Sequence, residues 1–173
     1  FDGRLSAEIT GYTPTARVKH SKIVNLPKAS AEVVKGYEVR SLFVASKGMK
    51  YVSADAAALE NRTVADFTYE FDNGKYADLV LNGDSHSFNA TIFFPKETAK
   101  FDINSSNFDK DDLGFKPYRN KAKTGVYSLT YGASAKKFTK SLGLSESEGA
   151  VAYKNYWDAN KGLKLFKESV EKL

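Results

Sequence analysis

Four side chains spaced four residues apart form the most informative pattern in the chain: Arg119, Lys123, Tyr127 and Tyr131, followed directly by Gly132. Because an α-helix takes about 3.6 residues per turn, this spacing predicts two cations and two phenols on one helical face. Such cations bind polyphosphates through charge-assisted hydrogen bonds, and the rings suit stacking on a base or sugar. The pattern therefore predicts an anion-binding helix; a basic surface helix with half-buried tyrosines is the alternative.

The positive charge of the chain is concentrated in two zones. The 173 residues include 26 Lys and Arg against 21 Asp and Glu, which leaves a net charge of +5. Residues 116–140 hold seven Lys or Arg and no acid, and residues 17–50 hold eight against two acids. These zones indicate an anionic partner more clearly than the modest total does, although a lysine-rich solvated surface is also common.

Composition disfavours several other kinds of site. The chain has no cysteine, and His20 and His86 are its two histidines, which argues against a disulfide framework and against zinc. No apolar run approaches the roughly 18 residues of a membrane span, and no signal peptide is visible. With 42% hydrophobic residues, the chain is long enough to bury a core of its own, and a cytoplasmic location is expected.

Hydrophobic spacing and turn residues predict the elements that must position these side chains. Residues 39–43 and 50–54 are typical of two strands joined by a turn, and residues 54–71 of a helix. Residues 94–117, with Pro95, Pro117 and several acids, predict a long exposed loop or insertion. Further helices are predicted over 76–81, 86–93 (capped by Asp84 or Ser85), 119–141 (bent or interrupted at Gly132) and from a Ser145 cap onward.

A second chemical signal lies where a predicted strand ends. Asp55 follows residues 50–54 and precedes the next helix, so its carboxylate would stand beyond the sheet edge. Hard oxygen ligands of this kind suit Mg²⁺. Taken alone, Asp55 is better explained as a helix cap than as a metal ligand, and Glu60 and Arg62 are better explained as surface charges.

Together, these segments resemble family A DNA polymerases, the DNA polymerase I group, and most closely their bacteriophage branch. Residues 55–62, DAAALENR, resemble motif A (DxSxLExR), with Ala57 where the family often has serine. Residues 119–132, RNKAKTGVYSLTYG, resemble motif B (RxxxKxxxYxxxYG). Shorter matches follow the same order: TAR at 15–17 with NLP at 25–27, RSLF at 40–43, FDNGKY at 71–76 and NGDSH at 82–86. The resemblance covers nearly the whole chain apart from residues 94–117.

The resemblance implies a two-metal nucleotidyl transfer to a primer 3′-hydroxyl. Asp55 would hold two Mg²⁺ ions with help from the carbonyl of Ala56. Arg119, Lys123 and His86 would bind the triphosphate of a deoxynucleotide. Lys123 would also protonate the leaving pyrophosphate.

The remaining motif residues are implied to select the nucleotide and to contact primer–template DNA. Tyr127 would lie near the incoming sugar and base and would form, with Glu60, the gate that excludes a ribose 2′-hydroxyl. This pair disfavours the related single-subunit RNA polymerases. Tyr131 and Gly132 would lie beside the templating base, and Arg17 and Arg62 would contact the primer strand or order its surroundings.

The implied fold is α+β: a small antiparallel palm sheet that carries Asp55 and a largely helical fingers region, truncated before the motif C hairpin. Residues 1–85 would form a partial palm with motif A, and residues 86–173 the fingers with motif B, with 94–117 as an insertion. No His-Asp pair for motif C occurs in the chain, and two adjacent metals need at least two bridging carboxylates.

We therefore expect a piece of a DNA polymerase that is inactive alone. Its partners would be primer–template DNA, deoxynucleoside triphosphates and the remaining polymerase segments, namely the thumb, the motif C palm and any exonuclease. If the protein is viral, the host cell cytoplasm is its expected location. A non-catalytic module that binds DNA or nucleotides and derives from such a polymerase is the alternative.

Overall fold

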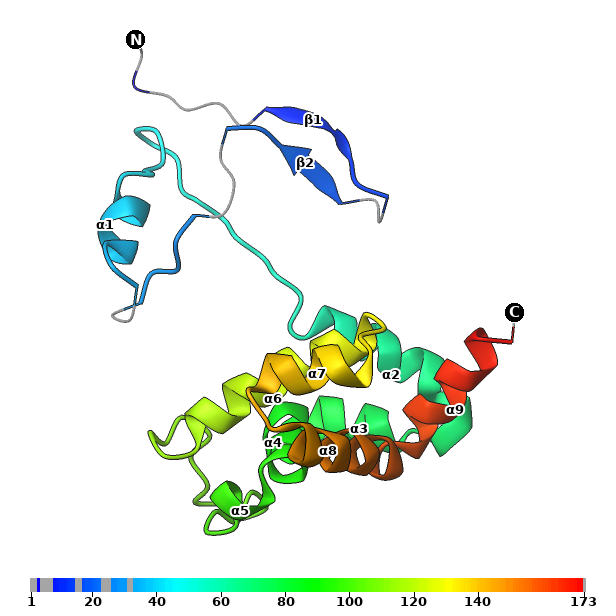
Figure 1. Ribbon diagram of the computed structural model, residues 1–173. Coiled ribbons are helices and arrows are strands. Elements are labelled where there is room, and N and C mark those ends of the chain that lie inside the picture. The colour runs from blue at the N-terminus through cyan, green and yellow to red at the C-terminus, as the bar shows by residue number, and fades with distance from the viewer. Residues whose placement is uncertain (1–2, 4–7, 15–16, 23–25, 31–32, 173) are drawn as a thin grey trace. The chain divides into compact units, whose positions relative to one another are not determined.

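The computed structural model describes residues 3, 8–14, 17–22, 26–30 and 33–172. The chain divides into two compact units, Phe1–Asp55 and Ala56–Leu173, which are described separately (Figure 1). The described residues form nine helices and two strands, so the fold is mostly helical with a small antiparallel sheet. None of these helices, over the described ranges, combines the length and apolar character that crossing a membrane requires.

The first unit contains a two-stranded antiparallel ribbon of β1 (Ile9–Tyr12) and β2 (Val18–His20). Tyr12 pairs with Val18 and Ile9 pairs with His20, and the register shifts between Ile9 and Gly11. A short helix, α1 (Gly36–Ser41), follows the ribbon.

The sheet predicted to carry Asp55 is not observed, so this part of the α+β prediction was wrong. Most of residues 39–43 lie in α1 instead of a strand, and residues 50–54 belong to no strand. A strand depends on hydrogen bonds from a neighbouring strand, whereas a helix satisfies its backbone locally, as the bond from the Val39 amide to the Lys35 carbonyl does at 3.0 Å. Asp55 consequently follows an irregular segment.

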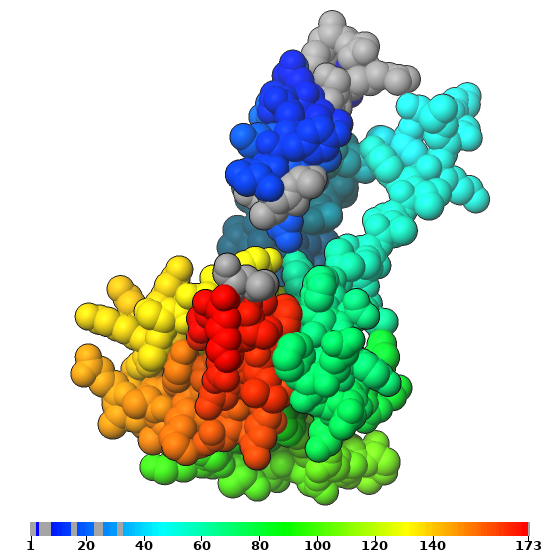
Figure 2. All heavy atoms as spheres, turned by 90° about the vertical axis from the view of Figure 1, so that its right-hand side faces the viewer, coloured from blue at the N-terminus to red at the C-terminus, as the bar shows by residue number. Residues whose placement is uncertain are grey.

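Helices make up the regular structure of the second unit. In this unit α4 packs against α6 and α8, and α2 packs against α3 and α9. Figure 2 shows α9, in red, lying beside the green end of α2 on the surface. The helices are α2 (Leu59–Asp72), α3 (Lys75–Asn82), α4 (Ser85–Phe93), α5 (Pro95–Thr98), α6 (Lys116–Thr130), α7 (Ala135–Leu142), α8 (Glu146–Ala159) and α9 (Lys161–Val170).

Capping residues explain where several helices begin. The Asp84 carboxylate accepts hydrogen bonds from the amides of His86 and Ser87, at 3.1 and 3.4 Å, and so starts α4. At the start of α8, Ser145 and Glu148 each accept a hydrogen bond from the other's backbone amide. Both predicted caps are thereby confirmed.

The long helix predicted over residues 119–141 is interrupted at the glycine. α6 ends at Thr130, Gly132 has a left-handed φ of 75°, and Ser134 caps α7. This conformation costs glycine little, which explains why the chain turns there. The last predicted helix is also divided, because Asn160 separates α8 from α9.

Residues 94–117 are not simply an exposed loop, which corrects the prediction for this segment. Phe94 and Phe115 are 3% and 0% exposed. The Phe115 ring meets those of Phe101 and Phe108 edge-on, with centroids 5.2 and 4.9 Å apart. Burying several aromatic rings stabilises a segment even where proline and glycine prevent regular structure.

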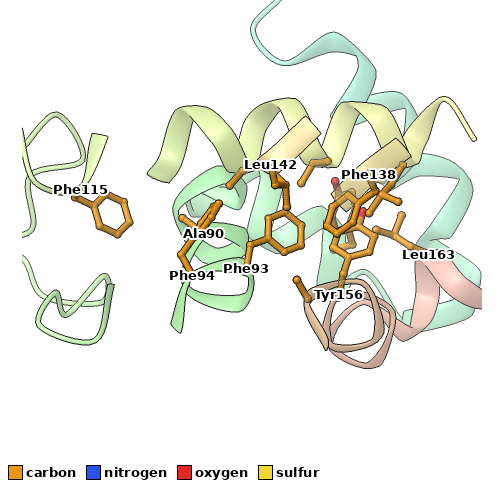
Figure 3. Packing of buried hydrophobic residues seen from close by; sticks show 14 residues of the cluster. Ala90, Phe93, Phe94, Phe115, Phe138, Leu142, Tyr156 and Leu163 are labelled. Carbon is orange, nitrogen blue, oxygen red and sulfur yellow. The ribbon is translucent and has the colours of Figure 1, made fainter. Parts of the chain in front are cut away.

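Aromatic side chains from three helices meet in the core (Figure 3). The ring centroid of Phe93 in α4 lies 5.1 Å from that of Phe138 in α7 and 5.7 Å from that of Tyr156 in α8. Gly125 lets α6 approach this cluster, since an added Cβ would lie 2.8 Å from Cδ2 of Leu142. A residue that lowers helix propensity thus permits close packing.

The contact between α7 and α8 leads to a stability prediction. A Cβ added at Gly149 in α8 would lie 2.6 Å from the Cβ of Thr139 in α7, so the two helices would have to separate. Gly149→Ala should therefore lower the free energy of unfolding by about 1 to 3 kcal/mol, although alanine favours helix. Urea unfolding checks this, with Ala150→Ser, an exposed neighbour in α8, as a control expected to change little. A more stable Gly149→Ala chain would contradict this account of the contact.

Candidate functional site

Arg119, Lys123 and Tyr127 all lie in α6 at helical spacing, as the sequence predicted. Arg119 and Tyr127 are partly buried, while Lys123 is exposed. Tyr131 follows the helix as its C-cap residue and is 68% exposed, and Gly132 comes next, where no atom lies within 4 Å of an added Cβ. Other positions of α6 face the core and hold the helix in place: Ala122, Val126 and Leu129.

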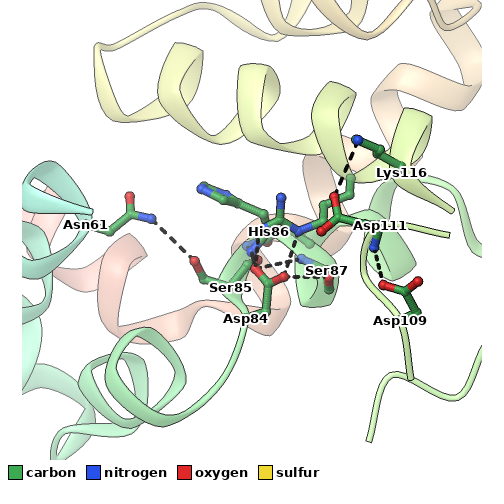
Figure 4. A network of polar contacts seen from close by, with 10 residues as sticks. Asn61, Asp84, Ser85, His86, Ser87, Asp109, Asp111 and Lys116 are labelled. Carbon is green, nitrogen blue, oxygen red and sulfur yellow. Dashed lines mark hydrogen bonds and ion pairs between the residues drawn. The ribbon is translucent and has the colours of Figure 1, made fainter. Parts of the chain in front are cut away.

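Asp84 joins α6 to the start of α4. Its Oδ2 accepts a hydrogen bond from Nε of Arg119 at 2.6 Å, and its Oδ1 accepts one from Nη2 at 3.2 Å. Oδ2 also accepts from the Ser87 hydroxyl at 2.8 Å, within the network that Figure 4 shows around Asp84. Partial burial raises the pKa of the Asp84 carboxyl, but the hydrogen bonds from Arg119 and Ser87 outweigh it and lower the pKa to about 2.

His86 lies in the first turn of α4 and contacts the same face of α6. His86 is 9% exposed, and its ring centroid lies 5.8 Å from that of Tyr127. Burial and then the charge of Arg119 lower the pKa of His86, and Lys123 adds to this against the opposing charge of Asp84, giving a pKa of about 4. The imidazole is therefore neutral at pH 7, and its Nδ1 is buried with no hydrogen-bond partner among the described residues.

Tyr127 interacts with both a cationic and an acidic residue. The Lys123 ammonium is 5.9 Å from the centre of the Tyr127 ring, within the range of a weak cation–π contact. Burial raises the pKa of the Tyr127 phenol, as do the charges of Glu60 and Tyr131. Glu60 in α2 is thus close enough to Tyr127 to act on it electrostatically.

Asp84, His86, Arg119, Lys123 and Tyr127 are together called the α4–α6 face.

Two asparagines that the sequence motifs did not single out connect to the start of α4. Asn61 in α2 is 2% exposed, and its Nδ2 donates to Oγ of Ser85 at 3.3 Å (Figure 4). Asn89 donates from Nδ2 to the Ser85 carbonyl at 2.7 Å. Buried polar groups need such partners. The Asn61 bond fixes α2 against the start of α4, whereas the Asn89 bond lies within α4. No spacing pattern predicts the Asn61 bond, because Asn61 lies 24 residues from Ser85.

The remaining predicted site residues lie apart from this face in the chain. Asp55 and Arg17 belong to the first unit, whereas Ala56 and Arg62 belong to the second. Arg62 donates from Nε to the Ala57 carbonyl at 2.9 Å. Of the motif segments named above, Thr15, Ala16 and Asn25 lie outside the described residues.

The residues predicted to hold Mg²⁺ fit it in donor chemistry but not in number. The Asp55 carboxylate and the Ala56 carbonyl are hard oxygen donors, and both residues are exposed. Within the described part of the chain, no group of three or more His, Cys, Asp or Glu is arranged to hold a metal. A magnesium site at Asp55 would need further ligands.

The neutral state of His86 leads to a pH prediction. Because its pKa is about 4 in the folded chain and 6.5 ordinarily, the unfolded chain takes up the proton first on acidification. The free energy of unfolding should therefore fall between pH 7 and pH 5, by up to about 1 kcal/mol per pH unit from this group. Urea unfolding at several pH values should show a weaker pH dependence in His86→Gln. The control His20→Gln, at an exposed position in β2, should keep the full dependence. Equal slopes in all three proteins would contradict the role of His86.

Comparisons with known proteins agree on one family. Residues 2–173 match the family model described as DNA polymerase family A. The chain is 30% identical over 126 residues to the DNA-directed DNA polymerases of Enterobacteria phage T3 and Escherichia phage T7, a match covering 72% of this chain and 15% of each phage protein. It is 26% identical over 167 residues to DNA polymerase I of Rhizobium leguminosarum, covering 91% of this chain and 14% of that protein.

These matches identify the family but concern only part of each relative. The chain spans about 15% of the length of the two phage polymerases. The family model, by contrast, matches the chain almost from end to end, and the motif segments lie within that match. The chain therefore belongs to DNA polymerase family A.

Proposed function

We propose that this chain forms the nucleotide-binding part of a template-directed DNA polymerase, which transfers a deoxynucleotide to a primer 3′-hydroxyl. The observation that carries the proposal is the α4–α6 face, where Arg119 and Lys123 act electrostatically on a neutral His86 whose ring lies 5.8 Å from that of Tyr127. The membership of the chain in DNA polymerase family A suggests the class of reaction.

The cations of the α4–α6 face would bind the triphosphate tail. A guanidinium and an ammonium donate charge-assisted hydrogen bonds to phosphate oxygens, and both are available on one helix. A neutral His86 would add a hydrogen-bond donor without a third positive charge. Lys123 is exposed, so it could also supply the proton that the leaving pyrophosphate takes up.

Tyr127 and Glu60 would select the sugar. The pKa of Tyr127 responds to the charge of Glu60, which supports the idea that the two act as a pair. Together they would occupy the space that a ribose 2′-hydroxyl needs, and so favour deoxynucleotides. Tyr131, 68% exposed at the end of α6, would lie beside the templating base, with Gly132 as the adjoining turn.

The motif A residues would complete the reaction with the rest of the polymerase. Asp55 and the Ala56 carbonyl would hold Mg²⁺, which when bound would align the 3′-hydroxyl with the α-phosphate and offset the developing charge. Arg17 and Arg62 would contact the primer strand. Residues 1–85 would belong to the palm and residues 86–173 to the fingers; the packing of α2 against α9 then joins palm and fingers segments within the second unit.

Lys123 offers the most direct test of nucleotide binding. Lys123→Ala should weaken binding of a deoxynucleoside triphosphate to the chain by about 10-fold, because one charge-assisted contact is lost. Isothermal titration measures the affinity. The matched control is Lys121→Ala, an exposed lysine two residues away in α6, which should change affinity less than twofold. Equal losses in both variants would indicate a general charge effect instead of a site.

Primer extension tests the catalytic half of the proposal. The 173-residue chain alone should extend no primer, because Asp55 is the one carboxylate in it that matches a metal-binding motif position and two metals need at least two. In a polymerase that contains this segment, Asp55→Ala should abolish extension while leaving nucleotide binding at the α4–α6 face within a few-fold. Extension by the chain alone would contradict this account.

A non-catalytic module that binds DNA is the second candidate, favoured by the basic zones at residues 17–50 and 116–140. It predicts affinity for primer–template or single-stranded DNA that falls steeply with salt. Titrating the chain with each DNA at about 50 and 200 mM salt separates the two candidates. Tight, salt-sensitive binding without any nucleotide affinity would favour the module.

A further inference from the structure

We infer that Asp84 is a positioning residue for the polyphosphate site, because it holds one edge of the Arg119 guanidinium and leaves the other edge free to bind phosphate. This inference rests on the proposed function. It concerns a residue for which the sequence predicted only a helix-capping role.

The pairing of Asp84 with Arg119 engages one defined edge of the guanidinium. Asp84 accepts hydrogen bonds from Nε at 2.6 Å and from Nη2 at 3.2 Å. These two nitrogens form the side edge of the planar guanidinium. A guanidinium has five N–H groups, of which Asp84 uses two. No further hydrogen bond of this guanidinium is found among the described residues. One N–H of Nη1 and the second N–H of Nη2 form the end edge, which matches two phosphate oxygens.

Asp84 is itself held firmly, which makes it suitable for orienting another side chain. The same carboxylate accepts hydrogen bonds from the amides of His86 and Ser87 and from the Ser87 hydroxyl. The Asp84 and Arg119 side chains are only 26% and 21% exposed, so solvent competes weakly for the pair. An arginine side chain without such a partner would lose conformational entropy when phosphate binds. Ordering the side chain before binding reduces this entropic cost.

Two other roles for Asp84 predict different effects of Asp84→Asn on phosphate affinity: one predicts no effect, and the other predicts tighter binding. If Asp84 only caps α4, its charge is irrelevant to phosphate affinity. If Asp84 competes with phosphate for Arg119, removing its charge should tighten binding. Asp84→Asn separates these roles, because asparagine caps helices as well as aspartate does but lacks the carboxylate that holds the side edge of Arg119.

The test uses inorganic tripolyphosphate and the full 173-residue chain in isothermal titrations. Asp84→Asn should weaken binding by about 2- to 10-fold, the cost of ordering one long side chain. In an Arg119→Lys background, which lacks the guanidinium, Asp84→Asn should change affinity less than twofold, because Asp84 acts through Arg119. Asp78→Asn, an exposed acid in α3, removes the same charge elsewhere and should have little effect.

A measurement without ligand keeps the inference testable on its own. The NMR signal of the Arg119 Nε–H group should be sharp and slow to exchange in the wild-type chain and in Asp78→Asn. It should broaden or disappear in Asp84→Asn. Unchanged or tighter tripolyphosphate binding by Asp84→Asn, or an unchanged Nε–H signal, would overturn the inference while leaving the proposed function standing. If the wild-type chain bound no tripolyphosphate, or bound it only as well as the Arg119→Lys variant, the proposed site would fail and the inference with it.

Discussion

The contact between α4 and α6 is the interaction on which the second unit depends. On its apolar side, Phe93 enters the aromatic core, and Gly125 lets α6 come close enough to cover it. At its polar end, Asp84 and Arg119 satisfy each other's charge at the start of α4. One helix pair thus combines the burial that stabilises the fold with a charged edge left facing solvent, and the candidate site lies on that edge.

The charged groups at this edge have a positive sum, which favours an anion over a cation. Arg119 and Lys123 contribute two positive charges, Asp84 returns one, and His86 stays neutral because burial and the neighbouring cations oppose its protonation. The face therefore carries a net positive charge without a buried unpaired cation. Under the proposed function, a polyphosphate would supply the negative charge that offsets this net positive charge.

Local sequence predicted the helix starts and turns of the second unit, but in the first it placed two strands at residues 39–43 and 50–54 that are not observed. The caps at Asp84 and Ser145 and the turn at Gly132 follow from interactions within a few residues, and these predictions were confirmed. Residues 39–43 were predicted as a strand, but strand formation depends on a distant partner, and the segment largely forms α1 instead. The burial of Phe115 was missed because its ring packs on Phe101 and Phe108 across the irregular segment before α6, a contact that no local pattern predicts.

The sequence by itself determined the order of the motifs, the family and the helical stripe of Arg119, Lys123 and Tyr127, since helical periodicity and motif spacing are properties of neighbouring residues. The family resemblance already grouped His86 and Glu60 with that stripe, but only the tertiary structure decided that Asp84 pairs with Arg119. Asp84 lies 35 residues before Arg119, and no pattern in the chain links the two. The neutral state of His86 was likewise decided by folding, because a pKa depends on burial and on charges brought together from different helices.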